Sequence, residues 1–262
     1  MSAGLEVTFL GTGTSTGVPE IGCHCKTCTS SDTRDKRLRA SVLVRKGDHQ
    51  ILIDCGPDFR TQMLKAGIEE LDAVFLTHEH YDHVGGLDDL RPFLRNNRHC
   101  PIYAEDTVLH AIRTRMPYAF KAHPYPGVPH LDLHSAMPFV PIEVAPGFVV
   151  EPIRVLHGKL PILGYMIDDF VYITDAKILP PETIARISGH TGTLVLNALR
   201  TYDHMAHFTL AEALEARELI TPKGETYLTH FTHTFGTHEE IAAMLPPHVH
   251  PAFDTLTIRT NR

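Results

Sequence analysis

Short apolar runs recur along the chain and alternate with segments of helical spacing. The runs are rich in β-branched and aromatic residues, which is typical of buried strands. Strands are predicted at 5–10, 40–45, 50–54, 73–76, 102–104, 148–156, 163–167, 170–174, 193–197 and 225–228, with a closing strand pair up to residue 258. The alternation of strands with helices predicts an α/β architecture of layered helices and sheets, organised as a single domain over residues 1–262.

Apolar residues spaced three and four positions apart predict the helices. These are expected at 59–66, 87–95, 106–115, 181–187, 209–220 and 238–244. The second is short or kinked because it contains Pro92. Gly67 is expected to end the first helix, and Asp106 to cap the third. The clearest is 209–220, whose apolar side is expected to carry Leu210, Ala213, Leu214 and Leu219.

The composition is that of a globular protein with enough length for a substantial core: 262 residues, 43% hydrophobic and 21% charged. A formal net charge of −7 argues against broad nucleic-acid binding, which needs a basic surface. The same net charge is compatible with a small phosphate-bearing substrate, because bound metal ions would make the local electrostatic potential positive. No basic segment leads into an apolar stretch near the start, and no apolar run is long enough to span a bilayer. A cytoplasmic protein without a membrane partner is expected.

Metal-type side chains gather directly after the predicted strand 73–76. His78, His80, Asp82 and His83 fall within six positions, on what is expected to be the loop that leaves this strand. Imidazoles and carboxylates are the usual ligands of zinc and comparable ions. A solvated polar loop is the alternative, but a loop with so many donors is costly to fold unless something satisfies them. We therefore expect a metal site here.

Three later donors stand at the ends of other predicted strands. They are His157, Asp175 and His230. A lone histidine or aspartate at a strand end is usually ordinary loop chemistry, so each has a simpler interpretation. Their shared placement favours a common site, and a hydrolytic centre with two metals needs such additional donors, including a carboxylate that can bridge.

The five cysteines are distributed unevenly. Cys23, Cys25 and Cys28 form a cluster, which in a cytosolic chain indicates metal binding rather than disulfides, with a redox-active thiol group as the alternative. Cys55 and Cys100 stand alone and are expected to be small buried apolar residues. The glycine-rich segment 11–17 lacks the Lys-Ser/Thr ending of a P-loop, so we interpret it as a tight turn near the site, with phosphate binding as the lesser alternative.

The order of the seven donors resembles the metallo-β-lactamase superfamily of metal-dependent hydrolases. The resemblance implies a four-layer αββα sandwich and a dinuclear site of zinc or manganese, with iron as a further option. In that site two metals share an activated hydroxide, which Asp82 would help to orient. His80 replaces the glutamate of the redox-active di-iron branch, which favours hydrolysis. The implied ligands are His78, His80 and His157 for one metal, Asp82, His83 and His230 for the other, and Asp175 as the bridge.

The cysteine cluster narrows the resemblance. Together with Gly11-Thr12-Gly13 and Gly17-Val18-Pro19, it is similar to the PhnP-like phosphoribosyl cyclic phosphodiesterase subfamily. The resemblance implies a homodimer and a structural zinc held by Cys23, Cys25, Cys28 and His233. It also implies a general acid just before the helix 209–220. His207 is the favoured candidate by its distance from the helix start, and His204 is the competitor.

The expected function is hydrolysis of small cyclic phosphodiesters of the ribose 1,2-cyclic phosphate or 2′,3′-cyclic nucleotide type, without a stable nucleic-acid partner. One alternative is a tRNA 3′-processing endonuclease of the ribonuclease Z type, although the long glycine- and proline-rich arm of that family is not evident. The other is a non-hydrolytic role like that of the pyrroloquinoline-quinone pathway protein, which carries a similar cysteine cluster. A β-lactamase proper would need an export signal.

Overall fold

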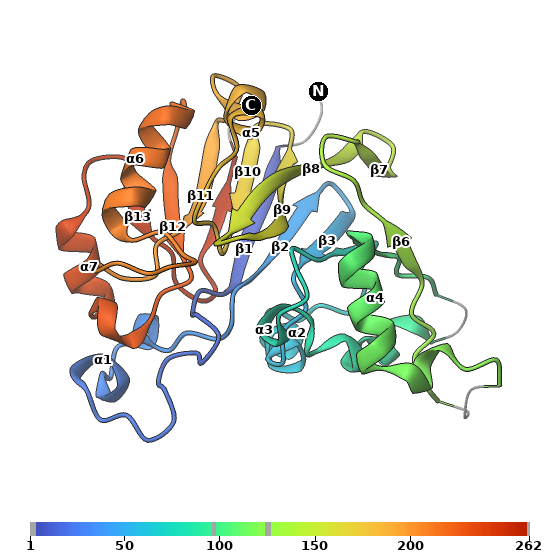
Figure 1. The fold of residues 1–262 in the computed structure, drawn as a ribbon. Coiled ribbons are helices and arrows are strands. Elements are labelled where there is room, and N and C mark those ends of the chain that lie inside the picture. The colour runs from blue at the N-terminus through green and yellow to red at the C-terminus, as the bar shows by residue number, and fades with distance from the viewer. Residues whose placement is uncertain (1–3, 96–97, 124–126, 261–262) are drawn as a thin grey trace.

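A computed structural model describes residues 4–95, 98–123 and 127–260, which form two seven-stranded sheets packed face to face (Figure 1). The first sheet has the order β14 (Thr257–Arg259), β1 (Leu5–Gly11), β2 (Ser41–Lys46), β3 (His49–Ile53), β4 (Ala73–Phe75), β5 (Ile102–Ala104) and β6 (Leu133–Ser135). The second has the order β13 (Val249–Pro251), β12 (Thr226–Thr229), β11 (Thr193–Asn197), β10 (Phe170–Ile173), β9 (Leu160–Ile167), β8 (Phe148–His157) and β7 (Ile142–Ala145).

The described helices are α1 (Lys26–Thr29), α2 (Phe59–Ala66), α3 (Tyr81–Val84), α4 (Asp106–Arg115), α5 (Pro181–Ile187), α6 (Leu210–Ile220) and α7 (His238–Met244). The five longest pack on the outer faces of the two sheets, and α1 lies in the loop between β1 and β2. Short 3₁₀ turns occur at Thr33–Asp35, Leu87–Leu94, Pro117–Phe120 and His233–Phe235. In Figure 1, α6 and α7 flank the sheets on one side and α2 and α4 on the other. This arrangement confirms the predicted αββα sandwich.

Three apolar clusters hold the layers together. The central one joins the facing sides of both sheets, with Phe9 of β1 and Tyr172 of β10 almost fully buried. A second packs α2 and α4 against the first sheet, and a third packs α5, α6 and α7 against the second. Each large apolar side chain buried in this way contributes roughly 1.5–3 kcal/mol of transfer free energy. Because both faces of each sheet are covered, β4, β10 and β11 are buried at every position.

Most predicted elements are confirmed, but four details were wrong. Asp82 and His83 lie in the short helix α3 rather than in a loop. Asp106 is the first residue of α4, and Glu105 occupies the cap position. The closing strands do not pair with each other: β13 joins β12, and β14 joins β1 in the other sheet.

The fourth correction concerns the face of α6. Leu219, expected on its apolar side, is 59% exposed. The helix buries Ala213, as predicted, together with Ala216 and Ile220, because these residues face the second sheet. Its start agrees with the prediction, since Thr209 and Glu212 form a reciprocal capping box at the helix N-terminus.

The strand directions bring several chain segments to one edge of the sandwich. β10, β11 and β12 run parallel, and β8 shares their direction because both β8 and β10 pair antiparallel with β9. The residues that follow β8, β10 and β12 therefore meet at one edge of the second sheet. None of the described helices has the length and apolar character needed to traverse a lipid bilayer.

Candidate metal centre

The seven predicted donors converge at this edge from five places in the chain. His78 and His80 follow β4, Asp82 and His83 belong to α3, His157 ends β8, Asp175 follows β10, and His230 follows β12. Their ligand atoms form two groups, in each of which all atoms lie within 4.8 Å of one another. One group is His78, His80 and His157, and the other is Asp82, His83, Asp175 and His230.

The backbone turns sharply where two of these donors leave their strands. Asp175 has a φ of 58° and His230 a φ of 63°, both in the left-handed region. Residues other than glycine rarely adopt this conformation, and where it occurs the surrounding structure must enforce it. Here it directs both side chains into the cluster immediately after β10 and β12 end.

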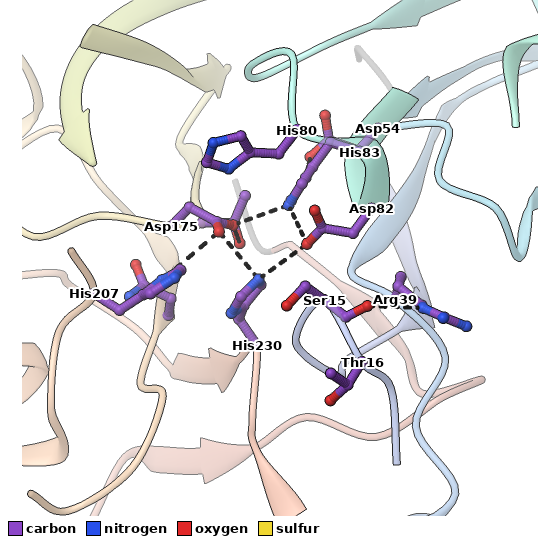
Figure 2. Close-up of polar contacts among 12 residues, drawn as sticks. Ser15, Thr16, Arg39, Asp54, His80, Asp82, His83, Asp175, His207 and His230 are labelled. Atoms are coloured by element: carbon purple, nitrogen blue, oxygen red, sulfur yellow. Dashed lines mark hydrogen bonds and ion pairs between the residues drawn. The ribbon is translucent and has the colours of Figure 1, made fainter. Parts of the chain in front are cut away.

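Asp175 lies between the histidines of the second group (Figure 2). Its Oδ2 lies 3.3 Å from His83 Nε2, and its Oδ1 lies 3.1 Å from His230 Nε2. Asp82 approaches the same two rings, with its Oδ2 3.2 Å from His83 Nε2 and 3.9 Å from His230 Nε2. In the first group, His78 Nε2 and His80 Nδ1 lie 2.9 Å apart. The ring nitrogens and carboxylate oxygens thus face one another across short gaps.

The donor set fits divalent metal ions. His83 Nε2 and both ring nitrogens of His230 are buried without a hydrogen-bond partner, and such orphaned nitrogens are costly unless a cation occupies the space before them. Imidazole and carboxylate suit zinc, manganese or iron. The chemistry and the clustering agree, so these residues would hold metal ions if the ions are supplied.

The carboxylates control the charge of the cluster. Burial alone lowers the pKa of a histidine, but Asp175, Asp54 and Asp82 outweigh it and raise the pKa of His83 well above its usual value. Against the same opposing effect of burial, Asp175 raises the pKa of His230 to about 9. Ligand histidines must be neutral, so protons compete with metal here and acid weakens binding.

Residues outside the two groups orient the ligands. Asp54 is fully buried and accepts hydrogen bonds from His83 Nδ1 at 2.6 Å and from the Thr77 amide at 2.8 Å. His157 Nδ1 lies 2.8 Å from the carbonyl oxygens of Asp175 and Ala206. A carbonyl only accepts, so Nδ1 carries the proton and Nε2 is left free for a ligand bond.

Asp54 was not predicted as a site residue. It has a φ of 64° and lies at the end of β3, which pairs with β4. The available signal was the aspartate directly after an apolar strand and before a Cys-Gly step. That signal is weak, because only the pairing of β3 with β4 brings Asp54 to His83.

His207 lies against the metal donors, whereas His204 lines the same cavity one step further away, with its ring centroid 5.0 Å from that of His207. The His207 ring centroid is 4.5 Å from that of His157 and 4.8 Å from that of His230, and its Nδ1 lies 3.7 Å from Asp175 Oδ1. His204 Nδ1 accepts hydrogen bonds from the amides of Ala206 and His207, so it holds the loop. Burial lowers the pKa of His207 to about 2, which makes this imidazole neutral near pH 7.

The donors open into a cavity of about 440 Å³. Its other walls come from the turn at residues 14–16, from Glu20, from Arg200 and Tyr202, and from residues 232–234. A second cavity of about 490 Å³ lies beside Lys223 and Arg259, and its lining includes none of the donor groups. We therefore take the cavity of about 440 Å³, which the metal donors line, as the candidate substrate site.

The cysteine cluster lies next to this cavity. Cys23, Cys25, Cys28 and His233 form a group of the same compactness, with His233 Nδ1 3.3 Å from Cys23 Sγ and 3.4 Å from Cys25 Sγ. The hydrogen bond between Cys25 Sγ and His233 Nδ1 lowers the pKa of Cys25 to about 6, which favours the thiolate that binds metal. Cys55 and Cys100 are buried, as expected, and burial raises the pKa of both thiols.

Comparison with known proteins places this arrangement in a family. Residues 49–231 match the family described as beta-lactamase superfamily domain. The chain belongs to the metallo-β-lactamase superfamily. A solved superfamily structure, described as a new diphosphatase from the PhnP family, is 35% identical, covers 98% of both chains and superposes with a TM-score of 0.89. This likeness confirms the predicted resemblance to PhnP-like members of the superfamily.

Two curated relatives differ in how much of each chain the similarity covers. An octanoyltransferase from Porphyromonas gingivalis is 47% identical over 254 residues, which are 96% of this chain and 51% of the relative. The chain therefore spans about half the length of that relative. A ribonuclease Z from Mycobacterium is 40% identical, but only over 88 residues, 33% of this chain and 25% of the relative.

Proposed function

We propose that this chain is a metal-dependent phosphodiesterase that hydrolyses small cyclic phosphodiesters. The supporting observation is the clustering of all seven histidine and aspartate donors beside a single cavity, which five of them and His207 line. Divalent ions bound there would lower the pKa of water and neutralise charge that develops on the phosphate. His78, His80 and His157 would hold one ion, Asp82, His83 and His230 the other, and Asp175 would lie between them.

The side chains around the donors supply the remaining steps. Asp82 reaches the cavity and is 9% exposed, so its carboxylate accepts a hydrogen bond from the attacking water and aligns it. His207 donates a proton to the leaving alkoxide. Burial holds the pKa of His207 low in the free protein, and an anionic phosphodiester beside the ring would raise it, which favours the protonated ring that this role requires.

The size and surroundings of the cavity favour a small substrate. A volume of about 440 Å³ lies within the range of small-molecule sites, roughly 300–1,000 Å³. The net charge of −7 disfavours a long polyanion. Ribose 1,2-cyclic phosphate and 2′,3′-cyclic nucleotides meet both conditions.

We further propose that Cys23, Cys25, Cys28 and His233 hold a structural zinc. Three thiols and one imidazole make a closed tetrahedral set, without an open position for substrate. Three of these ligands lie in the loop around α1 and the fourth opens the turn His233–Phe235. A bound ion would therefore tie the N-terminal part of the chain to the segment that carries His230.

Other activities are less well supported. The identity with ribonuclease Z is confined to a third of the chain. The octanoyltransferase is matched over about half its length. Its octanoyl-transfer activity can therefore reside in the half that this chain does not match. The intact hydrolytic donor set also argues against a role like that of the pyrroloquinoline-quinone pathway protein.

The test is a turnover panel on metal-loaded protein. It comprises ribose 1,2-cyclic phosphate, 2′,3′-cyclic AMP, bis(p-nitrophenyl) phosphate, a precursor tRNA and an octanoyl thioester. We expect the highest kcat/KM with a cyclic phosphodiester. Preference for the tRNA or the thioester, or no turnover of any phosphodiester, would overturn the proposal.

A further inference from the structure

Glu20 lies between the cysteine cluster and the cavity that the histidine and aspartate donors line. Its Oε2 lies 3.2 Å from His233 Nε2 and accepts a hydrogen bond from Thr16 Oγ1 at 3.3 Å. Its backbone amide donates to Cys28 Sγ at 3.3 Å, and its carbonyl accepts from the Cys23 amide at 3.0 Å. The residue also lines the catalytic cavity. One residue thus contacts the cysteine cluster through its backbone and its side chain, and the catalytic cavity through its side chain.

The His233 ring is engaged on both of its nitrogens. Nδ1 faces the sulfurs of Cys23 and Cys25, which leaves Nε2 to face Glu20. An ionised carboxylate only accepts hydrogen bonds, so Glu20 favours the tautomer with the proton on Nε2 and a lone pair on Nδ1. Metal-binding histidines are commonly fixed in this way by a carboxylate on the far nitrogen.

The same carboxylate reaches the turn beside the catalytic donors. Thr16 and Ser15 form the corner of a turn that is closed by a 2.8 Å hydrogen bond from the Gly17 amide to the Thr14 carbonyl. Arg39 holds the Ser15 carbonyl at 3.1 Å from one side, as Figure 2 shows. Glu20 holds the Thr16 hydroxyl at a second point. The wall of the cavity near Asp82 and His230 is therefore anchored partly through the cysteine cluster.

We propose that Glu20 is a positioning residue that orients His233 toward the structural metal and fixes the Thr16 wall of the catalytic cavity through the same carboxylate. This inference rests on the structural zinc site proposed above. Replacement of Glu20 weakens metal binding at the cysteines and loosens the cavity wall, while the catalytic ligands stay in place. Substrate binding then suffers more than the chemical step.

The test separates these two effects with cobalt(II), whose thiolate charge-transfer absorption reports the cysteine site and not the histidine and aspartate site. Wild type is compared with Glu20→Gln, Glu20→Ala and Thr16→Val. Glu218→Gln serves as a matched control, since this side chain is 75% exposed and remote on α6. The second readout is KM against kcat for a cyclic phosphodiester, and circular dichroism shows that each variant is folded.

We expect Glu20→Gln to lower cobalt affinity at the thiolate site about 10-fold and Glu20→Ala about 10- to 100-fold. Both raise KM several-fold more than they lower kcat. Thr16→Val raises KM and leaves the cobalt affinity unchanged, and Glu218→Gln changes neither. Unaltered cobalt affinity in both Glu20 variants would overturn the inference and leave the zinc site standing. No thiolate absorption in wild type would overturn the zinc site itself, and this inference with it.

Discussion

The two donor clusters lie side by side but are assembled in opposite ways. The proposed catalytic group consists of the seven histidine and aspartate donors. They come from α3, from the end of β8 and from the segments that follow β4, β10 and β12, in both sheets. The cysteine group takes three donors from one loop of six residues and adds a single histidine from the late part of the chain. The first is largely buried among secondary structure, and the second is half-exposed.

This difference separates the contributions of metal and fold. The histidine and aspartate cluster requires the complete sandwich. Its strands are β4, β8, β10 and β12, and at least one other strand lies between any two of them in the chain. Partners such as Asp54 hold its histidines in place without any ion. The cysteine loop has little regular structure, so an ion there would itself supply much of the order. Catalytic substitutions should therefore remove activity and keep the fold, and cysteine substitutions should do the reverse.

The largest effect is expected at Asp82. Asp82→Asn removes a metal ligand and the acceptor that aligns water, which costs several kcal/mol in the transition state, so kcat should fall about 10³-fold or more. The melting temperature and the cobalt–thiolate absorption should be retained. Asp88→Asn, an exposed carboxylate shortly after α3, is the control and should leave kcat unchanged. Near-normal turnover by Asp82→Asn would contradict the catalytic assignment of the cluster.

His207→Ala should slow hydrolysis in a manner that depends on the leaving group. Loss of a general acid costs about 10²-fold or more when the leaving group is an alkoxide, and little when it is a nitrophenolate that needs no proton. His204→Ala is the matched comparison, because His204 holds the same loop and lines the same cavity, and its loss should slow both substrates to the same extent. Equal losses on both substrates would assign His207 to binding or structure instead.

Asp54→Asn should weaken metal binding at the His83 site about 10- to 100-fold, as is usual when the carboxylate behind a ligand histidine is removed. Competition with a chelator, read by metal-dependent activity, measures the change. Asp72→Asn alters a similar aspartate–histidine pair at a half-buried position outside the donor groups, where His49 Nδ1 lies 3.1 Å from Asp72 Oδ1, and should leave metal affinity unchanged. The same affinity in both variants would show that Asp54 serves only the fold.

Cys25→Ser should have the smallest effect on catalysis and a moderate one on stability. Loss of the structural ion is expected to cost about 2 kcal/mol, or roughly 4–8 °C in Tm. Zinc content should fall by the share held at the cysteines, with kcat altered less than about 3-fold because all catalytic ligands remain. Cys100→Ser, at a buried thiol outside both clusters, controls for the loss of sulfur. If Cys25→Ser retains its full zinc content, the cysteine cluster is not the structural site.

The sequence predicted the parts of the fold that depend on local pattern. Apolar runs and helix caps located most strands and the five longest α-helices, including the end of α2 at Gly67 and the start of α6 after Thr209. The ranges did not include β6, β7, α1 or α3, and the helix predicted at 87–95 is a 3₁₀ helix. The seven donors were found because their residue types and their places after strands resemble a known family. Such signals are contained within a few neighbouring residues, so a single chain displays them.

Features that depend on distant contacts were not predicted. The role of Asp54 arises only when β3 pairs with β4, and β14 finds its partner β1 at the other end of the chain. The burial of Ala216 in place of Leu219 depends on how α6 rotates against the second sheet. The contact between Glu20 and His233 likewise depends on the folded chain. The two residues are 213 positions apart, so no pattern among neighbouring residues indicates it.

Anomalous X-ray diffraction from crystals of active, metal-loaded protein tests the central claim most directly, because it locates each ion. We predict a pair of peaks among His78, His80, Asp82, His83, His157, Asp175 and His230, and a separate zinc peak among Cys23, Cys25, Cys28 and His233. Active protein with no peak in the histidine and aspartate group would contradict the assignment of catalysis to that cluster.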